Sequence, residues 1–386
     1  MKRWIFLFSL FLFSALAAGA FFAFRMVAQA GYNNKADLNN DDCVNSGDLT
    51  LFAGYFLQDD ARGDINNDTS VDTKDFALMM DSWNQCLQLG AGDYTFTIQS
   101  GGLTRSFDVH VPPSYRAGTQ MPLVMNFHGG GSTPAGQRAM TLMNLTSNQK
   151  GFIAVYPQGS PRTTNPNDTN YFWNPGLGDL GYMYPLTNIK NINDVGFVSD
   201  LLDDMEERFT VNTKKVYATG MSNGGIMTHT LGCKLANRIA AIAPVEGELW
   251  LDSSLCTPSR AMPVLIVHGT ADTYIPYNGG VPICTALADN DWKSVDDAVN
   301  IWRGENSCST ASTTQQITSD VSCKTYSSCS GTSEVSVCTV TGGGHTWSGG
   351  LGYIPPSADP SCAIGAIGTA SANEIMWTFF SSHSLP

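Results

Sequence analysis

Hydrophobic residues follow two different spacings along the chain, and each spacing predicts a different kind of β-strand. In residues 94–98 and 107–111 every second residue is apolar, which is typical of antiparallel strands with one face in water. Residues 123–127 and 152–156 are nearly continuous apolar runs, as expected for parallel strands buried on both faces. We expect further buried strands at 216–219, 239–243, 264–267 and 335–340.

Residues 194–209 have a helical period instead. Their apolar side chains recur three and four positions apart and define one face of a helix: Val195, Val198, Leu201, Leu202, Met205 and Phe209. Asn193 or Asp194 can cap its N-terminus. Strands that alternate with helices in this way predict an α/β fold with an open, mostly parallel sheet.

A different pattern precedes the first strand, because residues 37–48 and 64–75 repeat one another. Helical apolar spacing follows both copies, at Leu49, Phe52 and Phe56 and again at Phe76, Met79 and Trp83. Within each copy, oxygen-bearing side chains occupy loop positions 1, 3, 5, 9 and 12: Asp37, Asn39, Asp41, Asn45 and Asp48, then Asp64, Asn66, Asp68, Asp72 and Asp75. Hard oxygen ligands at this spacing suit Ca²⁺. The duplication favours two calcium loops over two Asp/Asn-rich turns.

Residues 36–86 resemble a type I dockerin, a calcium-dependent module that attaches enzymes to cohesin-bearing scaffolds. The family has glycine at loop position 6, where this chain has Asp42 and Thr69, but both copies keep the family's aspartate at position 12. The resemblance implies a small all-α calcium-binding domain at residues 31–90 and a cohesin-bearing scaffold as a partner.

Composition narrows the class of partner. A chain of 386 residues predicts one large domain with a smaller one. A net charge of -13 leaves no basic surface for phosphates, so nucleic acid is excluded as a partner. Neutral polymers and small esters fit better.

The N-terminus predicts export from the cytoplasm. Lys2 and Arg3 precede the apolar run 4–24, and residues 28–30 form a small-x-small cleavage site. We expect residues 1–30 to be a cleaved signal peptide; the alternative is an uncleaved membrane anchor, because the run is long enough to span a bilayer.

The ten cysteines indicate disulfides in an exported protein. Cys323 and Cys338 flank a turn at residues 330–331 symmetrically, so they can face each other across a hairpin. Pairing of Cys43 with Cys86 and of Cys233 with Cys256 is consistent with their positions, although connectivity does not follow from sequence.

The candidate chemistry starts at residues 216–225, V-Y-A-T-G-M-S-N-G-G. A strand running into G-x-S-x-G and then a helix is typical of a nucleophile elbow, in which small neighbours relieve the crowding around a strained serine. Ser222 is therefore the predicted nucleophile.

A serine needs a base, and the base needs an orienting carboxylate. After Ser222, the strand at 264–267 leads to Asp272, and the strand at 335–340 leads through three glycines to His345. The order Ser, Asp, His and the placement after strands agree with a catalytic triad. The acidic residues Asp289 and Asp291 are weaker substitutes for Asp272. The other five histidines are expected to have structural or surface roles, with His128 and His268 bracing loops.

Acyl transfer also needs N–H donors for the developing oxyanion. The amide of Asn223, directly after the serine, is one predicted donor. The second is expected from the H-G-G-G loop at residues 128–131, from Gly130 first and Gly131 second.

Residues 91–386 resemble the secreted esterase family that contains polyhydroxybutyrate depolymerases and feruloyl esterases, with acetyl xylan esterases nearby. The matching segments lie in family order at 127–130, 156–159, 194–197, 216–225, 268–272 and 343–347. The resemblance implies an α/β-hydrolase fold with a mostly parallel sheet flanked by helices, the triad Ser222, Asp272 and His345, and no cofactor for catalysis. Ser348 stands where the family has proline, and residues 170–185 lack the family's cysteines.

Trp173, Tyr274 and Trp347 are candidates for an aromatic wall against the substrate, since rings can stack on a ferulate or a sugar. The dockerin-like region favours feruloyl or acetyl esters of plant polysaccharide, with polyester depolymerisation as the alternative. A non-catalytic calcium-dependent scaffold or adhesion protein is the alternative from another class.

Overall fold

The computed structural model describes residues 35–39, 44–58, 60–83, 89–161, 163, 165, 169–176, 191–251, 253–282, 292–352 and 364–386. The chain divides into two units, Met1–Gln88 and Leu89–Pro386. The described ranges contain no helix with the length and apolar character that crossing a bilayer requires.

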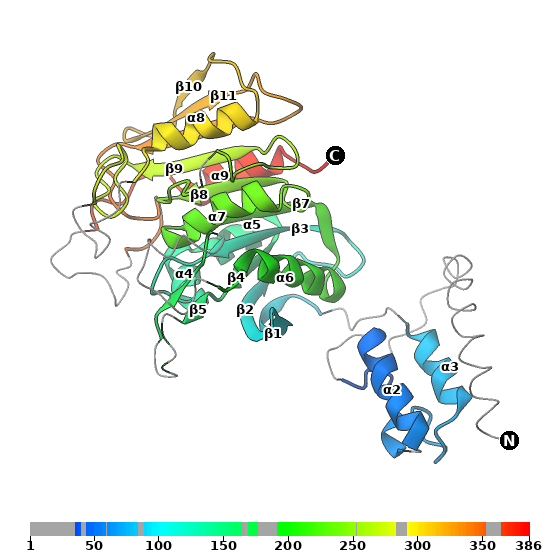
Figure 1. Ribbon diagram of the computed structural model, residues 1–386. Helices are drawn as coiled ribbons and strands as arrows, with labels where there is room; N and C mark the ends of the chain where they lie inside the picture. The colour runs from blue at the N-terminus through cyan, green and yellow to red at the C-terminus, as the bar shows by residue number, and fades with distance from the viewer. Residues whose placement is uncertain are drawn as a thin grey trace. The chain divides into compact units, whose positions relative to one another are not determined.

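The first unit is helical and has its own core (Figure 1). It contains α2 (Ser46–Gln58), the short 3-10 helix η1 (Ala61–Gly63) and α3 (Thr73–Asp81). Phe52 packs against Phe56 and Phe76 with ring centroids 6.1 Å apart in both pairs. The core contains residues from both copies of the sequence repeat: Ala36, Val44, Phe52, Ile65 and Met79.

The second unit is built on one ten-stranded sheet with the order β1-β2-β4-β3-β7-β8-β9-β12-β11-β10. Its strands are β1 (Gly92–Ser100), β2 (Leu103–Val111), β3 (Met121–Phe127), β4 (Ile153–Pro157), β7 (Val211–Met221), β8 (Ala241–Val245), β9 (Val264–Gly269), β10 (Thr313–Gln316), β11 (Val321–Tyr326) and β12 (Val335–Val340). The six strands from β4 to β12 are parallel, and antiparallel pairs extend both ends. The expected mostly parallel sheet is confirmed. The two short strands β5 (Ser160–Pro161) and β6 (Tyr171–Phe172) pair separately.

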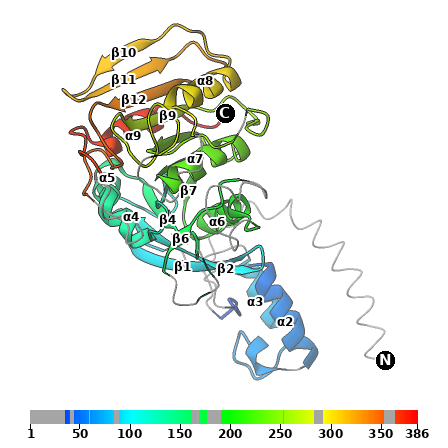
Figure 2. The ribbon, with the colours of Figure 1, turned by 60° about the vertical axis from the view of Figure 1, so that its left-hand side comes forward.

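Helices cover both faces of the sheet (Figures 1 and 2). They are α4 (Pro134–Thr141), α5 (Met143–Lys150), α6 (Asp194–Arg208), α7 (Asn223–Lys234), α8 (Val295–Glu305) and α9 (Ala372–Ser381). Within β3, Leu123 and Met125 pack in one core with side chains of α6, α7 and α8, whereas Val124 packs in a second core with side chains from the α4–α5 region and α9. Burial on both faces explains why these strands are continuous apolar runs.

The local signals predicted α6 closely. The helix spans Asp194–Arg208, and the Asn193 side chain accepts a hydrogen bond from the Gly196 amide as its N-cap. On its apolar face Val198, Leu201, Leu202 and Met205 are fully buried, and Val195 is partly buried.

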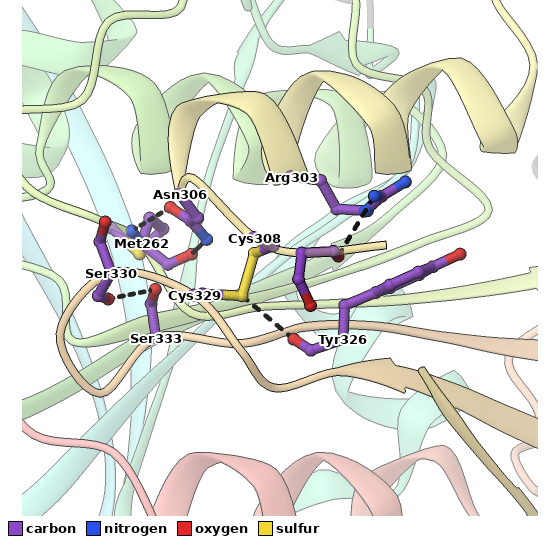
Figure 3. Close-up of a disulfide and its surroundings, with 9 residues drawn as sticks. Met262, Arg303, Asn306, Cys308, Tyr326, Cys329, Ser330 and Ser333 are labelled. Carbon is purple, nitrogen blue, oxygen red and sulfur yellow. Dashed lines mark hydrogen bonds between the residues drawn. A yellow bond between two sulfur atoms is a disulfide. The ribbon is translucent and has the colours of Figure 1, made fainter. Parts of the chain in front are cut away.

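Three disulfides join described residues. Cys323–Cys338 lies between directly paired positions of β11 and β12, so the predicted hairpin disulfide is confirmed. Cys233–Cys256 is also formed. The sequence did not predict Cys308–Cys329, which ties the end of α8 to the loop before β12 (Figure 3). The Cys43–Cys86 pair lies outside the described residues.

The same region is fixed by side-chain contacts. Asn306 accepts a hydrogen bond from the Met262 amide at 2.8 Å and donates one to the Met262 carbonyl at 2.6 Å. The Arg303 guanidinium lies 4.4 Å from the centroid of the Tyr326 ring (Figure 3). These contacts anchor the end of α8 to the residues just before β9 and to the end of β11.

Candidate active site

Four neighbouring parallel strands end at the same edge of the sheet, and each is followed by a polar residue. Ser222 follows β7, Glu246 follows β8, Asp272 lies three residues after β9, and His345 lies five residues after β12. These strands are adjacent in the order β7-β8-β9-β12. The carboxyl ends of parallel strands are where open α/β sheets place their sites.

Ser222 lies in a strained turn. Its φ of 59° and ψ of -123° place a non-glycine residue in the left-handed half of backbone space. Its amide donates to the Val245 carbonyl at 3.0 Å, and its own carbonyl accepts from Ile226 as α7 begins. A Cβ on Gly224 would collide with the carbonyl oxygens of Phe127 and His128, so the turn requires glycine there. The predicted nucleophile elbow therefore has the expected geometry.

Asp272 and His345 form a buried pair. His345 Nδ1 donates to Asp272 Oδ2 at 2.7 Å, and Asp272 Oδ1 accepts from the amides of Tyr274 at 2.7 Å and Ile275 at 2.9 Å. Burial acts to raise the pKa of Asp272. The neighbouring His345 and His268 side chains outweigh burial and lower that pKa, so the carboxylate is ionised. The proton on His345 Nδ1 leaves Nε2 as the nitrogen that can accept one.

Ser222 and His345 are not hydrogen-bonded to one another among the described contacts of the site. Asp272 is thus hydrogen-bonded to His345, and Ser222 lies at the same edge of the sheet without a hydrogen bond to His345. Such hydrogen bonds are often long in enzymes without substrate and tighten when substrate binds.

The loop at residues 128–131 lies against the serine. A Cβ on Gly129 would be 3.4 Å from the Ser222 Cβ. The Gly131 amide donates to the Tyr171 carbonyl at 2.8 Å, so Gly131 is wrong as an oxyanion donor. The amides of Gly130 and Asn223 have no acceptor among the described residues, and they are the two donors left for an oxyanion.

His128 braces this loop, as expected from the sequence. Its Nδ1 donates to the Gly129 carbonyl at 2.8 Å, and its Nε2 accepts from the Gly159 amide at 3.0 Å. Burial lowers the pKa of His128 to about 4, which keeps the ring neutral.

The aromatic residues named from the sequence have different roles. Trp173 is fully buried and donates from Nε1 to the His128 carbonyl at 2.9 Å, and Trp347 is buried with its Nε1 on Asn373 at 3.0 Å. Both are core residues, so their assignment to a substrate wall is wrong. Tyr274 is half-buried and stacks on the His345 ring, with centroids 5.0 Å apart. It is the remaining aromatic candidate beside the site.

The side chain of Asn223 is a support that sequence reasoning missed. Its Oδ1 accepts from the Trp173 amide at 2.7 Å and its Nδ2 donates to the Trp173 carbonyl at 3.2 Å. Because Trp173 also holds the His128 carbonyl, Asn223 connects the elbow to the glycine loop. A polar side chain directly after the serine was the available signal.

Glu246 and His268 were also missed as parts of the site. Glu246 is buried, adopts φ 44°, and accepts from the Gly269 amide at 3.0 and 3.1 Å. His268 Nε2 lies 3.3 Å from Glu246 Oε2 and 3.4 Å from Asp272 Oδ2. Burial and the neighbouring charge of Asp272 raise the pKa of Glu246 well above its usual range. A charged residue directly after a fully buried strand was the signal in the sequence.

The repeated loops of the first unit use their last aspartate in the same way. Asp48 accepts from the amides of Asn39 at 3.1 Å and Asn45 at 2.8 Å, and Asp75 accepts from those of the equivalent residues Asn66 at 3.0 Å and Asp72 at 2.9 Å. Both aspartates are fully buried.

The described loop residues keep the geometry of position 6 as well. Thr69, which occupies it in the second loop, has φ 72°, a left-handed conformation that glycine adopts more readily than other residues. Lys74 Nζ lies 3.0 Å from Asp68 Oδ2, so the second loop contains an ion pair between two of its own residues. Asp41 lies outside the described residues.

Comparison with known proteins places this geometry in context. Residues 116–299 match the model of the phospholipase/carboxylesterase family. The chain is 29% identical over 256 residues to feruloyl esterase B from Piromyces equi, which covers 62% of this chain and 42% of that protein. It is 29% identical over 170 residues to the bifunctional acetylxylan esterase/xylanase XynS20E from Neocallimastix patriciarum, covering 44% of this chain and 22% of that protein. The chain thus spans less than half the length of these two relatives.

Among solved structures, the acetyl xylan esterase from Aspergillus awamori superposes with a TM-score of 0.51 and 13% identity. The match covers 75% of this chain and 99% of that one. The second unit has the α/β-hydrolase fold, as the resemblance implied.

Proposed function

We propose that the second unit is a serine carboxylic ester hydrolase. The observation that carries the proposal is the buried Asp272–His345 pair at the sheet edge where Ser222 occupies a strained elbow. Feruloyl and acetylxylan esterases among its relatives support the same reaction class.

The reaction proceeds through an acyl-enzyme. His345 Nε2 takes the proton from Ser222 as the hydroxyl oxygen attacks the ester carbonyl, and Asp272 stabilises the imidazolium through Nδ1. The amides of Asn223 and Gly130 donate to the oxyanion. His345 then gives its proton to the leaving alcohol, and water repeats the sequence to release the acid.

The proposed substrates are feruloyl or acetyl esters of plant cell-wall polysaccharide, as the names of the two fungal relatives suggest. A panel of methyl ferulate, acetylated xylan and a short polyhydroxybutyrate oligomer tests the choice. Turnover of either of the first two supports it, and turnover of only the oligomer would assign a polyester substrate instead.

The role of the serine is tested by kinetics on an aryl ester. Ser222→Ala is expected to lose about 10⁴-fold or more in kcat. Ser381→Ala, an exposed position in α9, is the matched control and keeps wild-type turnover. Near-normal turnover of the Ser222 variant would reject the proposal.

We also propose that the two loops of the first unit bind Ca²⁺ and that this unit serves as a docking module for a cohesin-bearing scaffold. Two fully buried aspartates with the same amide partners in each loop support it, as do the hard oxygens of Asp37, Asn39, Asn45, Asp64, Asn66, Asp68 and Asp72. Bound Ca²⁺ would supply the charge that organises the loop oxygens.

Calorimetric titration of the whole chain with Ca²⁺ tests ion binding. Asp64→Ala is expected to remove one of two binding events, and Asp81→Ala, an exposed aspartate outside the loops, leaves both. Equal heats for wild type and Asp64→Ala would refute binding at the second loop.

We propose that the protein acts outside the cytoplasm, with residues 1–30 as its export signal. The three disulfides between described residues support this, because such bonds persist in oxidising compartments.

A further inference from the structure

Two carboxyl groups and two imidazoles lie close together in the interior, at the carboxyl ends of β8, β9 and β12. One ligand-type atom each of Glu246, Asp272 and His345 lie within 4.8 Å of one another, and His268 Nε2 lies within 3.4 Å of both carboxyl groups. Glu246, His268 and Asp272 are each exposed by 6% or less. Two negative charges cannot both be buried here without compensation.

The backbone holds Glu246 in this space at a conformational cost. Its φ of 44° is unusual for a residue with a side chain, and both carboxyl oxygens accept from the Gly269 amide. The preceding carbonyl, of Val245, accepts the amide of Ser222. Strained residues persist where the surroundings fix them, and they gather at functional sites.

The two nitrogens of the His268 ring have different surroundings. Its Nε2 donates to the Ile275 carbonyl at 2.8 Å, while its Nδ1 is buried without a hydrogen-bond partner. A protonated ring would place an unsatisfied N–H at Nδ1, which is unfavourable in the interior. A proton on one of the two carboxyl groups relieves their repulsion without that cost.

The hydrogen bonds show which group carries that proton. Asp272 accepts from two backbone amides and from His345, all of which stabilise its ionised form. Glu246 accepts from one backbone amide only. The pKa shifts of the two carboxyl groups point the same way. Burial and Asp272 raise the pKa of Glu246, whereas the pKa of Asp272 is lowered by its histidine neighbours.

We propose that Glu246 is a neutral carboxylic acid at working pH and that its hydroxyl donates a hydrogen bond to Asp272, which holds the Asp272 carboxylate against His345. Glu246 is then a positioning residue: its proton stays on Glu246 throughout turnover. The assignment of this role rests on the proposed esterase function, but the protonation state does not.

The protonation state is tested by infrared difference spectroscopy at neutral pH. The wild-type-minus-Glu246→Gln spectrum is expected to show the carbonyl stretch of one protonated carboxylic acid. Glu374→Gln, which removes an exposed glutamate paired with Lys150, is the matched control and gives no such band. Absence of the band from the Glu246→Gln difference would overturn the proposal.

The positioning role is tested by steady-state kinetics. Glutamine can donate to Asp272 and accept from Gly269, so Glu246→Gln keeps kcat within about threefold, whereas Glu246→Ala lowers kcat about tenfold with KM unchanged. Wild-type kcat falls at alkaline pH as Glu246 ionises beside Asp272, His268 and His345, and the glutamine variant lacks that fall.

Equal losses in the two variants, or the same alkaline fall in wild type and Glu246→Gln, would overturn the role. If Glu246→Ala does not fold, the infrared band and the pH profile of kcat for Glu246→Gln decide between a neutral and an ionised Glu246. Failure of the esterase proposal itself is separate, because wild type would then turn over no ester while the infrared test still stands.

Discussion

Replacing Asp272 by asparagine is expected to leave the fold intact and stop the chemistry. Asp272 Oδ1 accepts from the amides of Tyr274 and Ile275, and its other oxygen accepts from His345 Nδ1. An asparagine has only one accepting oxygen. That oxygen is expected to stay on the two amides, because the flipped side chain would lose both hydrogen bonds.

The asparagine NH₂ group then faces His345 Nδ1 and requires that nitrogen to accept. The ring proton moves to Nε2, the nitrogen that must take the proton from Ser222, so the base is blocked. In a triad the wrong tautomer lowers kcat by about 10⁴-fold, which corresponds to about 5 kcal/mol of transition-state stabilisation.

The assay is the kcat and KM of Asp272→Asn on a soluble aryl ester, with Asp296→Asn as the control for loss of one charge at an exposed position of α8. The expected result is a loss in kcat at nearly constant KM, with the control unchanged. A kcat within tenfold of wild type would refute the reasoning about the tautomer.

Two further predictions concern stability. Gly224→Ala is expected to destabilise the fold by about 3 kcal/mol or more in chemical denaturation, because the added Cβ meets rigid backbone carbonyls, whereas Gly304→Ala in α8 has open space and stabilises by about 0.5–1 kcal/mol. Equal effects would contradict the close approach at the elbow. In the folded protein the pKa of His128 is lowered to about 4, whereas the unfolded chain has the ordinary value of about 6.5. Between these pH values only the unfolded chain takes up a proton at this residue. The free energy of unfolding is therefore expected to fall by about 3 kcal/mol as the pH drops from 6.5 to 4. His128→Gln keeps an acceptor for the Gly159 amide and is expected to remove this part of the pH dependence. If the unfolding free energy of His128→Gln depends on pH as that of the wild type does, the lowered pKa of His128 is not its cause.

Much of the fold was predictable because its signals are local. A parallel strand buried on both faces needs a run of apolar residues, and β3, β8 and β9 each have one. The order of Ser222, Asp272 and His345 after such strands then places them at one edge, since parallel strands share a direction.

The support around the site was not predictable, because it depends on contacts between distant segments. Glu246 reaches Asp272 only because β8 and β9 are neighbours in the sheet, and strand order is not a property of any short stretch. Trp347 follows His345 closely but faces the core, where Asn373 accepts its indole N–H. Sequence gives the spacing of a side chain from a motif, and packing decides its direction.

Gly131 shows the same limit within a recognised loop. Gly130 and Gly131 are chemically alike, and only the β6 backbone, through the Tyr171 carbonyl, occupies one of the two amides. The neutral state predicted for Glu246 is a stronger case, because it follows from how Glu246, His268, Asp272 and His345 come together at the carboxyl ends of three strands, β8, β9 and β12.

Covalent labelling tests directly whether Ser222 is a nucleophile activated by His345 and Asp272. A fluorophosphonate reacts with a serine only when a base activates it. Wild type treated with the reagent and mapped by peptide mass spectrometry is expected to carry a single adduct on Ser222, and Asp272→Asn is expected to label far more slowly. An unmodified Ser222 in folded wild-type protein would contradict its role as the activated nucleophile of the triad.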